Sequence, residues 1–132
     1  MSREILFRGM TKTGKFVYGS FIKNKIDCPF IVDIEAYQHE VIPSTVGQYT
    51  ELKDKNGTKI FDGDILEKYH FKDRQGKIHT MKKVVMWCND LSAWTFSHTE
   101  NDILKPYNYL RTILKDNDCE VIGSIHDKGK EK

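Results

Sequence analysis

The stretch of sequence that decides the fold is residues 77–98, KIHTMKKVVMWCNDLSAWTFSH. In residues 77–88 and in residues 93–98, successive side chains would lie on opposite faces of the chain, which is the two-residue period of a β-strand. The four residues between them, Asn89 to Ser92, are of a length that closes a hairpin and would place Cys88 opposite Ala93. The stretch therefore predicts two antiparallel strands joined by a short turn.

This register brings large apolar side chains together in pairs. Trp87 would lie opposite Trp94, and Val85 opposite Phe96, with both pairs on the same face of the hairpin. Cross-strand pairs of this kind contribute roughly 0.2–1 kcal/mol each. A slip of one residue would move one indole to the other face, so the pattern also specifies the register. We interpret this face as structural core, with both indoles packed inside.

A nucleic-acid-binding β-barrel is the functional alternative for the same hairpin, with aromatic rings stacking on bases beside basic side chains. Its candidate residues are Lys77, Lys82, Lys83, Trp87 and Trp94. The charge balance disfavours this alternative without removing it. The chain has 21 Lys and Arg against 19 Asp and Glu, a net charge of +2, and the two signs interleave along the sequence.

Turn signals divide the rest of the chain into short stretches rich in β-branched and aromatic residues, which predicts a mainly β fold of antiparallel strands. The expected strands are 3–8, 15–23, 29–34, 45–50, 64–71 and 119–126. A single short helix is expected over 106–115, opened by Pro106 at its first position. With 132 residues, the chain fits one domain over residues 1–126, followed by a charged tail over 127–132.

Several classes of protein are disfavoured by simple observations. The longest apolar run is only five residues, Val84 to Cys88, whereas a spanning helix needs about twenty. The first residues carry charges where a secretory signal would be apolar. Cys28, Cys88 and Cys119 are dispersed, which favours reduced thiols in a cytoplasmic protein over a disulfide framework. No catalytic combination of residues is found, so we expect neither an enzyme nor a cofactor.

The segment with most turn-forming and acidic residues is 45–65, TVGQYTELKDKNGTKIFDGDI. Asn56-Gly57 and Gly63 are suited to tight turns, and Asp54, Asp62 and Asp64 lie on or beside these turns. If the three carboxylates converged, they could hold Mg²⁺ or Ca²⁺, and a small metal- or ligand-dependent enzyme that uses them is the third, least favoured function. Their spacing matches no standard metal loop, however, so we interpret them mainly as residues that cap backbone amides.

Several motifs of this sequence resemble the YopX family, and together they span nearly the whole chain. They are REILFRG (3–9), FVYGS (16–20), VGQYT (46–50), LKDKNG (52–57), IFDGDI (60–65) and EVIGSI (120–125). The chain departs from the family pattern at Glu51, where the family usually has Gly, and at Ser124 and His126, where it usually has Asn and an aromatic residue. The departure at Glu51 suggests that this position does not need a positive φ angle.

The resemblance implies a barrel-like β core, a homo-oligomer and an origin in a bacteriophage or prophage. It implies no activity and no site residues. We therefore expect a non-enzymatic phage accessory protein in the cytoplasm of the bacterial host, without membrane contact. It would act through protein–protein contacts with itself and with an unknown phage or host protein, because open sheet edges must be paired or covered.

Overall fold

The computed structural model describes residues 3–23, 28–98 and 106–127. The chain divides into two compact units. The first is formed by Met1–Glu51 with His126–Lys132, and the second by Leu52–Ile125. The expectation that residues 1–126 behave as one domain stays a prediction.

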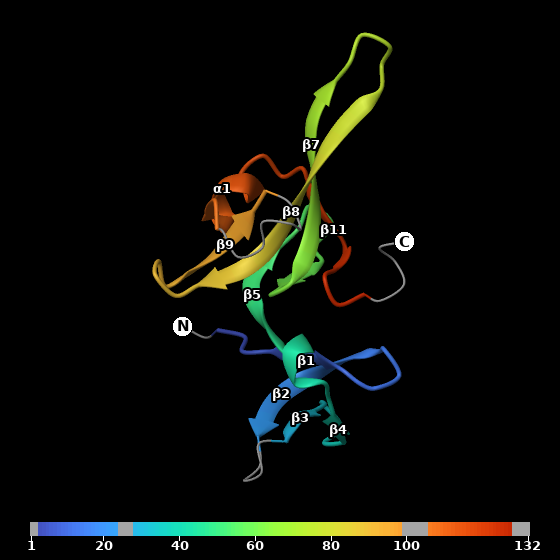
Figure 1. Ribbon diagram of the computed structural model, residues 1–132, viewed down its shortest axis with the longest axis vertical. Coiled ribbons are helices and arrows are strands. Elements are labelled where there is room, and N and C mark those ends of the chain that lie inside the picture. Colours follow the sequence, from blue (N-terminus) through green and yellow to red (C-terminus); the bar gives the residue numbers. More distant parts are fainter. Residues whose placement is uncertain (1–2, 24–27, 99–105, 128–132) are drawn as a thin grey trace. The chain divides into compact units, whose positions relative to one another are not determined.

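The described residues are mainly β, which confirms the predicted fold class (Figure 1). The strands are β1 (Phe7–Met10), β2 (Phe16–Lys23), β3 (Pro29–Val32), β4 (Gln38–Glu40), β5 (Gly47–Lys53), β6 (Lys59–Phe61), β7 (Asp64–Lys72), β8 (Ile78–Cys88), β9 (Ala93–Ser97), β10 (Asn108–Tyr109) and β11 (Cys119–Ser124). A 3₁₀ turn, η1 (Pro43–Thr45), and one helix, α1 (Leu110–Leu114), complete the described elements.

The first unit is built on antiparallel strands in the order β4-β3-β2-β1-β5. Gly19 is required where β2 pairs with β3, because a Cβ at this position would lie 2.0 Å from the carbonyl oxygen of Val32. β5 continues across the boundary into the second unit, where β6 neighbours it.

The second unit holds an antiparallel sheet in the order β10-β9-β8-β7-β11. Its core consists of apolar side chains from the sheet, from β6 and from α1, namely Ile60, Leu66, Val85, Phe96, Leu110, Ile113 and Cys119. Burial of these side chains stabilises a helix as short as α1, which would not form alone in water.

The structure confirms the predicted register of the β8–β9 hairpin, but it shows that one of the two indoles is exposed. Trp87 pairs with Trp94, and Val85 with Phe96. The indoles meet edge to face, with ring centroids 5.2 Å apart. Trp94 packs against the core, but Trp87 is 43% exposed and donates its indole N–H to Asn89 Oδ1 at 2.8 Å. The prediction that both indoles are packed inside is therefore wrong for Trp87, since it lies beyond the part of the hairpin that the core covers.

Four hairpin turns share one hydrogen-bond pattern. In each, the N–H of the first residue donates to the carbonyl of the fifth, and the N–H of the fourth donates to the carbonyl of the first. The turns span residues 11–15, 33–37, 54–58 and 73–77. The fourth residue has a positive φ angle in every case: Gly14, Ala36, Gly57 and Gly76. Because Ala36 replaces the usual glycine, no turn signal is present there, and β4 was not expected.

Other boundaries also differ from the prediction. β1 begins at Phe7 rather than at residue 3, β5 extends to Lys53, and β6 was not expected. The helix is shorter than 106–115, because its N-cap is Tyr109 and β10 precedes it, so Pro106 does not open it. In the described residues neither sheet closes on itself, so the barrel-like core is not confirmed. No described helix is long and apolar enough to cross a bilayer.

Glu51 corrects a further expectation. Its φ angle is 70°, so the backbone at this position does adopt the left-handed conformation that favours glycine. The carboxylate accepts a hydrogen bond from Arg3 Nε at 2.8 Å. The position therefore does need a positive φ angle, and a residue other than glycine is strained there.

Candidate functional site

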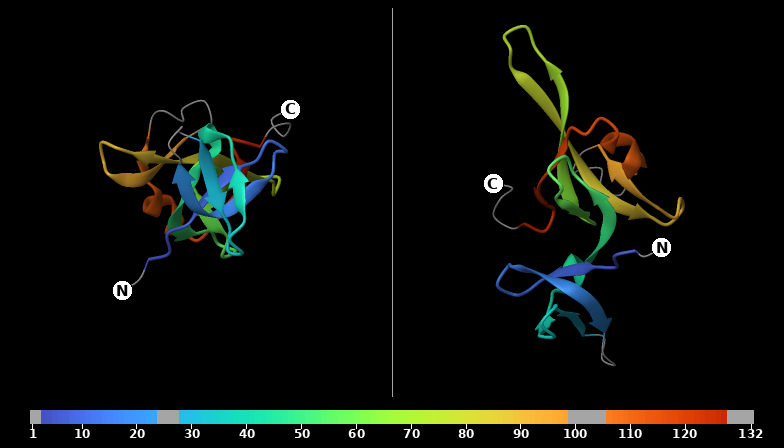
Figure 2. Two further views of the ribbon diagram at one scale, coloured as in Figure 1. Left: turned by 90° about the horizontal axis from the view of Figure 1, so that it is seen from below. Right: turned by 180° about the vertical axis from the view of Figure 1, so that it is seen from behind.

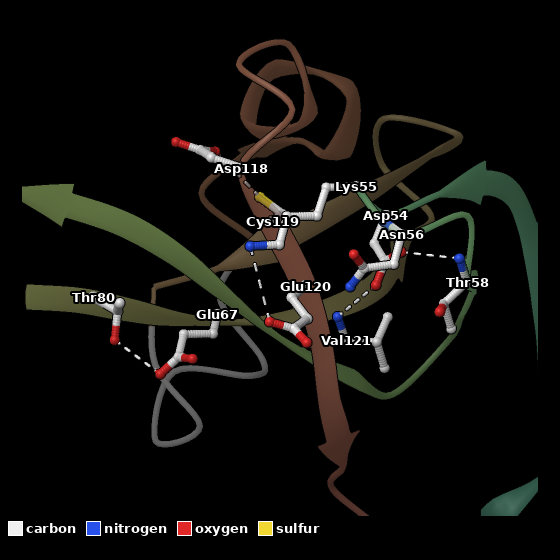
Figure 3. A network of polar contacts seen from close by, with 10 residues as sticks. All are labelled: Asp54, Lys55, Asn56, Thr58, Glu67, Thr80, Asp118, Cys119, Glu120 and Val121. Atoms are coloured by element: carbon white, nitrogen blue, oxygen red, sulfur yellow. Dashed lines mark hydrogen bonds and ion pairs between the residues drawn. The ribbon is translucent and has the colours of Figure 1, made fainter. Parts of the chain in front are cut away.

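Asp54 joins the turn between β5 and β6 to strand β11 (Figure 3). Its Oδ1 atom accepts the amide protons of Asn56 at 2.8 Å and Thr58 at 2.9 Å. Its Oδ2 atom accepts the amide proton of Val121 at 2.9 Å. The side chain is nearly buried. Both oxygens are thus occupied by backbone donors, which is the capping role expected from the sequence.

Lys55 and Glu120 extend this contact. The amide of Lys55 donates to the carbonyl of Cys119 at 3.0 Å, and its ammonium group lies 4.0 Å from Glu120 Oε1. Two segments that are 65 residues apart in the sequence therefore meet through backbone groups, so β11 is covered along the edge that faces away from β7.

The other two candidate metal ligands do not form a cluster with Asp54. Asp64 is buried, and its Oδ2 atom accepts the amide proton of Phe61 at 2.7 Å. Asp62 is half-buried beside it. Within the described ranges, no group of three or more His, Cys, Asp or Glu side chains is close enough to hold a metal ion. Asp54 and Asp64 instead stabilise two turns.

The feature of the second unit that stands out is a two-stranded arm formed by the outer parts of β7 and β8, residues 69–82 (Figures 1 and 2). β11 pairs with β7 only as far as Lys68, and β9 pairs with β8 only as far as Val84. Beyond these positions β7 and β8 pair only with each other in the described structure. The ribbon extends past the rest of the second unit and ends in the 73–77 turn.

One face of this arm can be defined from the register. Tyr69 pairs with Thr80, Lys72 pairs with Ile78, and the alternation along β8 adds Lys82 to the same side. The 73–77 turn at the tip carries two further exposed cations, Arg74 and Lys77. We call Tyr69, Lys72, Ile78 and Lys82, together with Arg74 and Lys77 at the tip, the arm face; all six side chains are exposed.

The opposite face of the arm is more structured. Phe71 stacks on His79, with ring centroids 4.5 Å apart and planes 9° from parallel. His79 Nε2 lies 2.9 Å from Asp73 Oδ2, while Asp73 Oδ1 accepts the amide protons of Gln75 and Lys77. These contacts give the arm a defined shape even though no other described strand flanks it.

The residues of the alternative interpretation, a platform for nucleobases, are not brought together. Lys77 and Lys82 lie on the arm face, whereas Trp87 and Trp94 lie near the other end of the β8–β9 hairpin. Ten residues of extended strand separate Lys77 from Trp87, which corresponds to about 33 Å. Lys83 points away from the arm face and is buried. The basic residues and the indoles therefore belong to different parts of the unit.

Lys83 is the most unusual ionisable group of this unit. Its Nζ atom lies 2.8 Å from His98 Nδ1 and 5.5 Å from the centre of the Phe96 ring. His98 is in ring contact with Tyr107 at 3.7 Å. Burial, and the charge of Lys68, lower the pKa of Lys83 from its ordinary value. No salt bridge to Lys83 is found within the described ranges.

Sequence reasoning missed Tyr69, Lys72 and Arg74 as part of an exposed surface. The strands over 64–71 and 77–88 were both expected, and the five residues between them are few enough to predict the β7–β8 hairpin. The overlooked signal was length, because β7 and β8 are longer than the strands beside them. Strands that outrun their neighbours must project from the sheet.

Comparison with known proteins places this chain in a family. The family model described as YopX protein matches residues 10–130, which is nearly the whole chain. The match includes the Asp54 turn, β11 and the arm. No curated protein matches the chain. The chain therefore belongs to the YopX family.

Proposed function

We propose that this YopX-family chain is a non-enzymatic accessory protein that acts through protein–protein contacts, and that its first unit binds a second copy of itself. The observation that carries the proposal is a group of large apolar side chains left exposed on that unit. They are Tyr18, Ile22, Ile34 and Tyr37, and the Ile34 side chain is fully exposed. Exposed apolar groups of this size gathered on one small unit are typical of an interaction surface.

The position of these side chains favours pairing through strand β4. Tyr18 and Ile22 are four residues apart on β2 and share a face, while Ile34 and Tyr37 lie in the turn that leads into β4. Among the described strands, β4 forms one edge of the sheet. An open antiparallel edge can pair with the same edge of a second copy across a two-fold axis.

The hydrogen bonds of the β3–β4 hairpin indicate which groups are available. Asp33 and Tyr37 form a bonded pair, as do Pro29 and Val41. Because bonded and non-bonded pairs alternate in an antiparallel ladder, the amides of Gln38 and Glu40 point away from β3. These two amides would donate to the second copy.

The acidic residues support a non-enzymatic role. Asp54, Asp64 and Asp73 have the side chain of an acid, a base or a metal ligand, but they accept backbone amide protons and hold turns in place. The family resemblance extends the proposal to a phage or prophage setting in the bacterial cytoplasm, with an unknown phage or host protein as a further partner.

Light scattering coupled to size-exclusion chromatography tests the self-association. Wild type is expected to exceed the mass of a 15.4 kDa monomer at high concentration. Ile34→Lys with Tyr37→Lys, and separately Glu40→Pro, are expected to shift it to the monomer. Leu91→Lys with Ile122→Lys is the matched control, since these exposed side chains lie in the second unit. A monomeric wild type, or an unaltered mass in both edge variants, would contradict the proposal.

A further inference from the structure

We propose that the β7–β8 arm binds duplex DNA, with its basic face against the phosphates and its ribbon in the major groove. This inference goes beyond the proposed self-association and uses a different unit of the chain. It also differs from the nucleic-acid-binding alternative drawn from the sequence, because the indoles have no part in it. Four observations carry it: the location of the charge, the state of the acidic side chains, the shape of the ribbon and the exposed side chains beside the cations.

The net positive charge of the chain is concentrated around the arm. Residues 67–82 contain five Lys and Arg and two Asp and Glu, a net charge of +3. Because the whole chain has a net charge of +2, the remaining 116 residues together have a net charge of −1. Although positive and negative residues interleave along the sequence, the surplus of positive charge lies on and beside the projecting arm. Such a projection is complementary to a polyanion.

The two acidic side chains in this range are engaged within the hairpin. Asp73 accepts two backbone amide protons and pairs with His79. Glu67 Oε2 accepts the hydroxyl proton of Thr80 at 2.8 Å. By contrast, no salt bridge within the described ranges involves the four cations Lys72, Arg74, Lys77 and Lys82, and all four are exposed. The positive charges are therefore presented to the solvent, while the acidic groups serve the turn and the strand pair.

The shape of the arm matches a groove. The B-DNA major groove admits a two-stranded β-ribbon. The arm is such a ribbon, and from residue 69 to residue 72 and from residue 78 to residue 82 it is flanked by no other described strand. The four residues of β7 and the five residues of β8 in this ribbon are roughly 13–17 Å long, which is enough to enter the groove and reach both phosphate backbones.

Tyr69 and Ile78 lie between the cations on the arm face. An isolated ribbon gains little from leaving these side chains in water, whereas apolar contact with sugars and with thymine methyl groups would bury them. A protein partner could also cover them. The surplus of exposed cations favours the polyanion, because Glu67, which lies opposite Lys82, and Asp73, which lies opposite Lys77, are both engaged in hydrogen bonds within the hairpin.

The binding of the full chain to a fluorescent DNA duplex, measured by anisotropy over a range of salt, tests this inference. The arm variant carries Lys72→Gln, Arg74→Gln, Lys77→Gln and Lys82→Gln. The charge-matched control carries Lys12→Gln, Lys15→Gln, Lys53→Gln and Lys115→Gln, which are exposed positions outside the arm. Circular dichroism and the mass in solution are recorded for both variants, so that loss of folding or of self-association is distinguished from loss of DNA binding.

Wild type and the control are expected to bind, and the arm variant is expected to bind roughly tenfold more weakly or worse at about 50 mM salt. The slope of log K against log salt should be smaller by about 3–4 in the arm variant, since each lost phosphate contact removes about 0.9. Absence of wild-type binding at low salt, or equal loss in both variants, would overturn the inference. A change of mass in the arm variant with unchanged DNA binding would assign the arm to a protein contact instead.

Discussion

The Nζ atom of Lys83 lies 2.8 Å from Nδ1 of His98, and the lysine side chain is only 3% exposed. If the ammonium group donates this bond, His98 accepts it as a neutral ring that is protonated on Nε2. Burial and the nearby Lys68 both disfavour the charged lysine, which explains the lowered pKa of Lys83. The pair is a polar element placed beside an apolar core.

Replacement of Lys83 by Met is expected to raise the midpoint of thermal unfolding at pH 7, because it removes a buried charge. The effect should shrink as the pH rises. The lowered pKa means that the folded protein releases this proton before the unfolded chain does, so wild type gains stability with pH up to the unfolded value near 10.4. Thermal melts at pH 7 and pH 10 measure the difference. Lys82→Met, at an exposed neighbour, should show no such trend, and a Lys83→Met gain that grows with pH would contradict the assignment.

Four described residues other than glycine have positive φ angles, namely Ala36, Glu51, Ser92 and Asn117, and the two with the largest angles offer a test of backbone strain. Ala36 has a φ angle of 71° and Glu51 one of 70°. Ala36→Gly is expected to stabilise the protein by about 0.5–1 kcal/mol, because the strain exceeds the entropy that glycine adds to the unfolded chain. Glu51→Gly should also stabilise it, by less, since the exposed ion pair with Arg3 is lost.

Gly57→Ala is the converse test at an equivalent turn position. Its φ angle is 81° and an added Cβ would meet nothing within 4 Å, so any loss comes from the backbone alone. We expect a loss of about 1 kcal/mol in urea unfolding. If this variant were neutral, positive φ angles would not limit stability in this protein.

Because Asp54 accepts three backbone amide protons, the isosteric variant Asp54→Asn is expected to lose folding stability. In Asp54→Asn one oxygen becomes an NH₂ group, which would face either the amide of Val121 or those of Asn56 and Thr58 as donor against donor. We expect losses of about 2 kcal/mol for Asp54→Asn and 2–4 kcal/mol for Asp54→Ala, because buried amides are left without acceptors. Urea unfolding measures both. Asp90→Asn, at an exposed site, should change little.

Two Asp–His pairs predict the response to acid. The hydrogen bond from His39 lowers the pKa of Asp33, and that from His79 lowers the pKa of Asp73. A carboxylate with a lowered folded pKa contributes stability above its unfolded pKa, near 3.9, and loses it as the pH falls through the folded pKa. The double variant Asp33→Asn with Asp73→Asn is therefore expected to lower the melting temperature at pH 6 more than at pH 2.5. An equal loss at both pH values would show that the negative charge of these carboxylates does not contribute to stability.

Much of the functional surface could not be predicted from the sequence. The basic residues of the arm were visible, but the acidic residues between them made the chain look evenly charged. Only the hairpin hydrogen bonds show that Asp73 and Glu67 are engaged while Lys72 and Lys82 are open. Burial of Lys83 and exposure of Trp87 likewise depend on which segments pack over β8, and such packing leaves no local pattern in the sequence.

The sequence by itself determined the strands around residues 77–98, their register, the glycine turns and the capping role of Asp54, because alternation and turn chemistry act over a few residues. The tertiary structure alone decided that β11 meets the 54–58 turn, that the strands form open sheets, that Ala36 turns the chain like a glycine, and that β7 and β8 outrun their neighbours. These features depend on contacts between distant segments, and burial and edge pairing are properties of the assembled sheet rather than of any one strand.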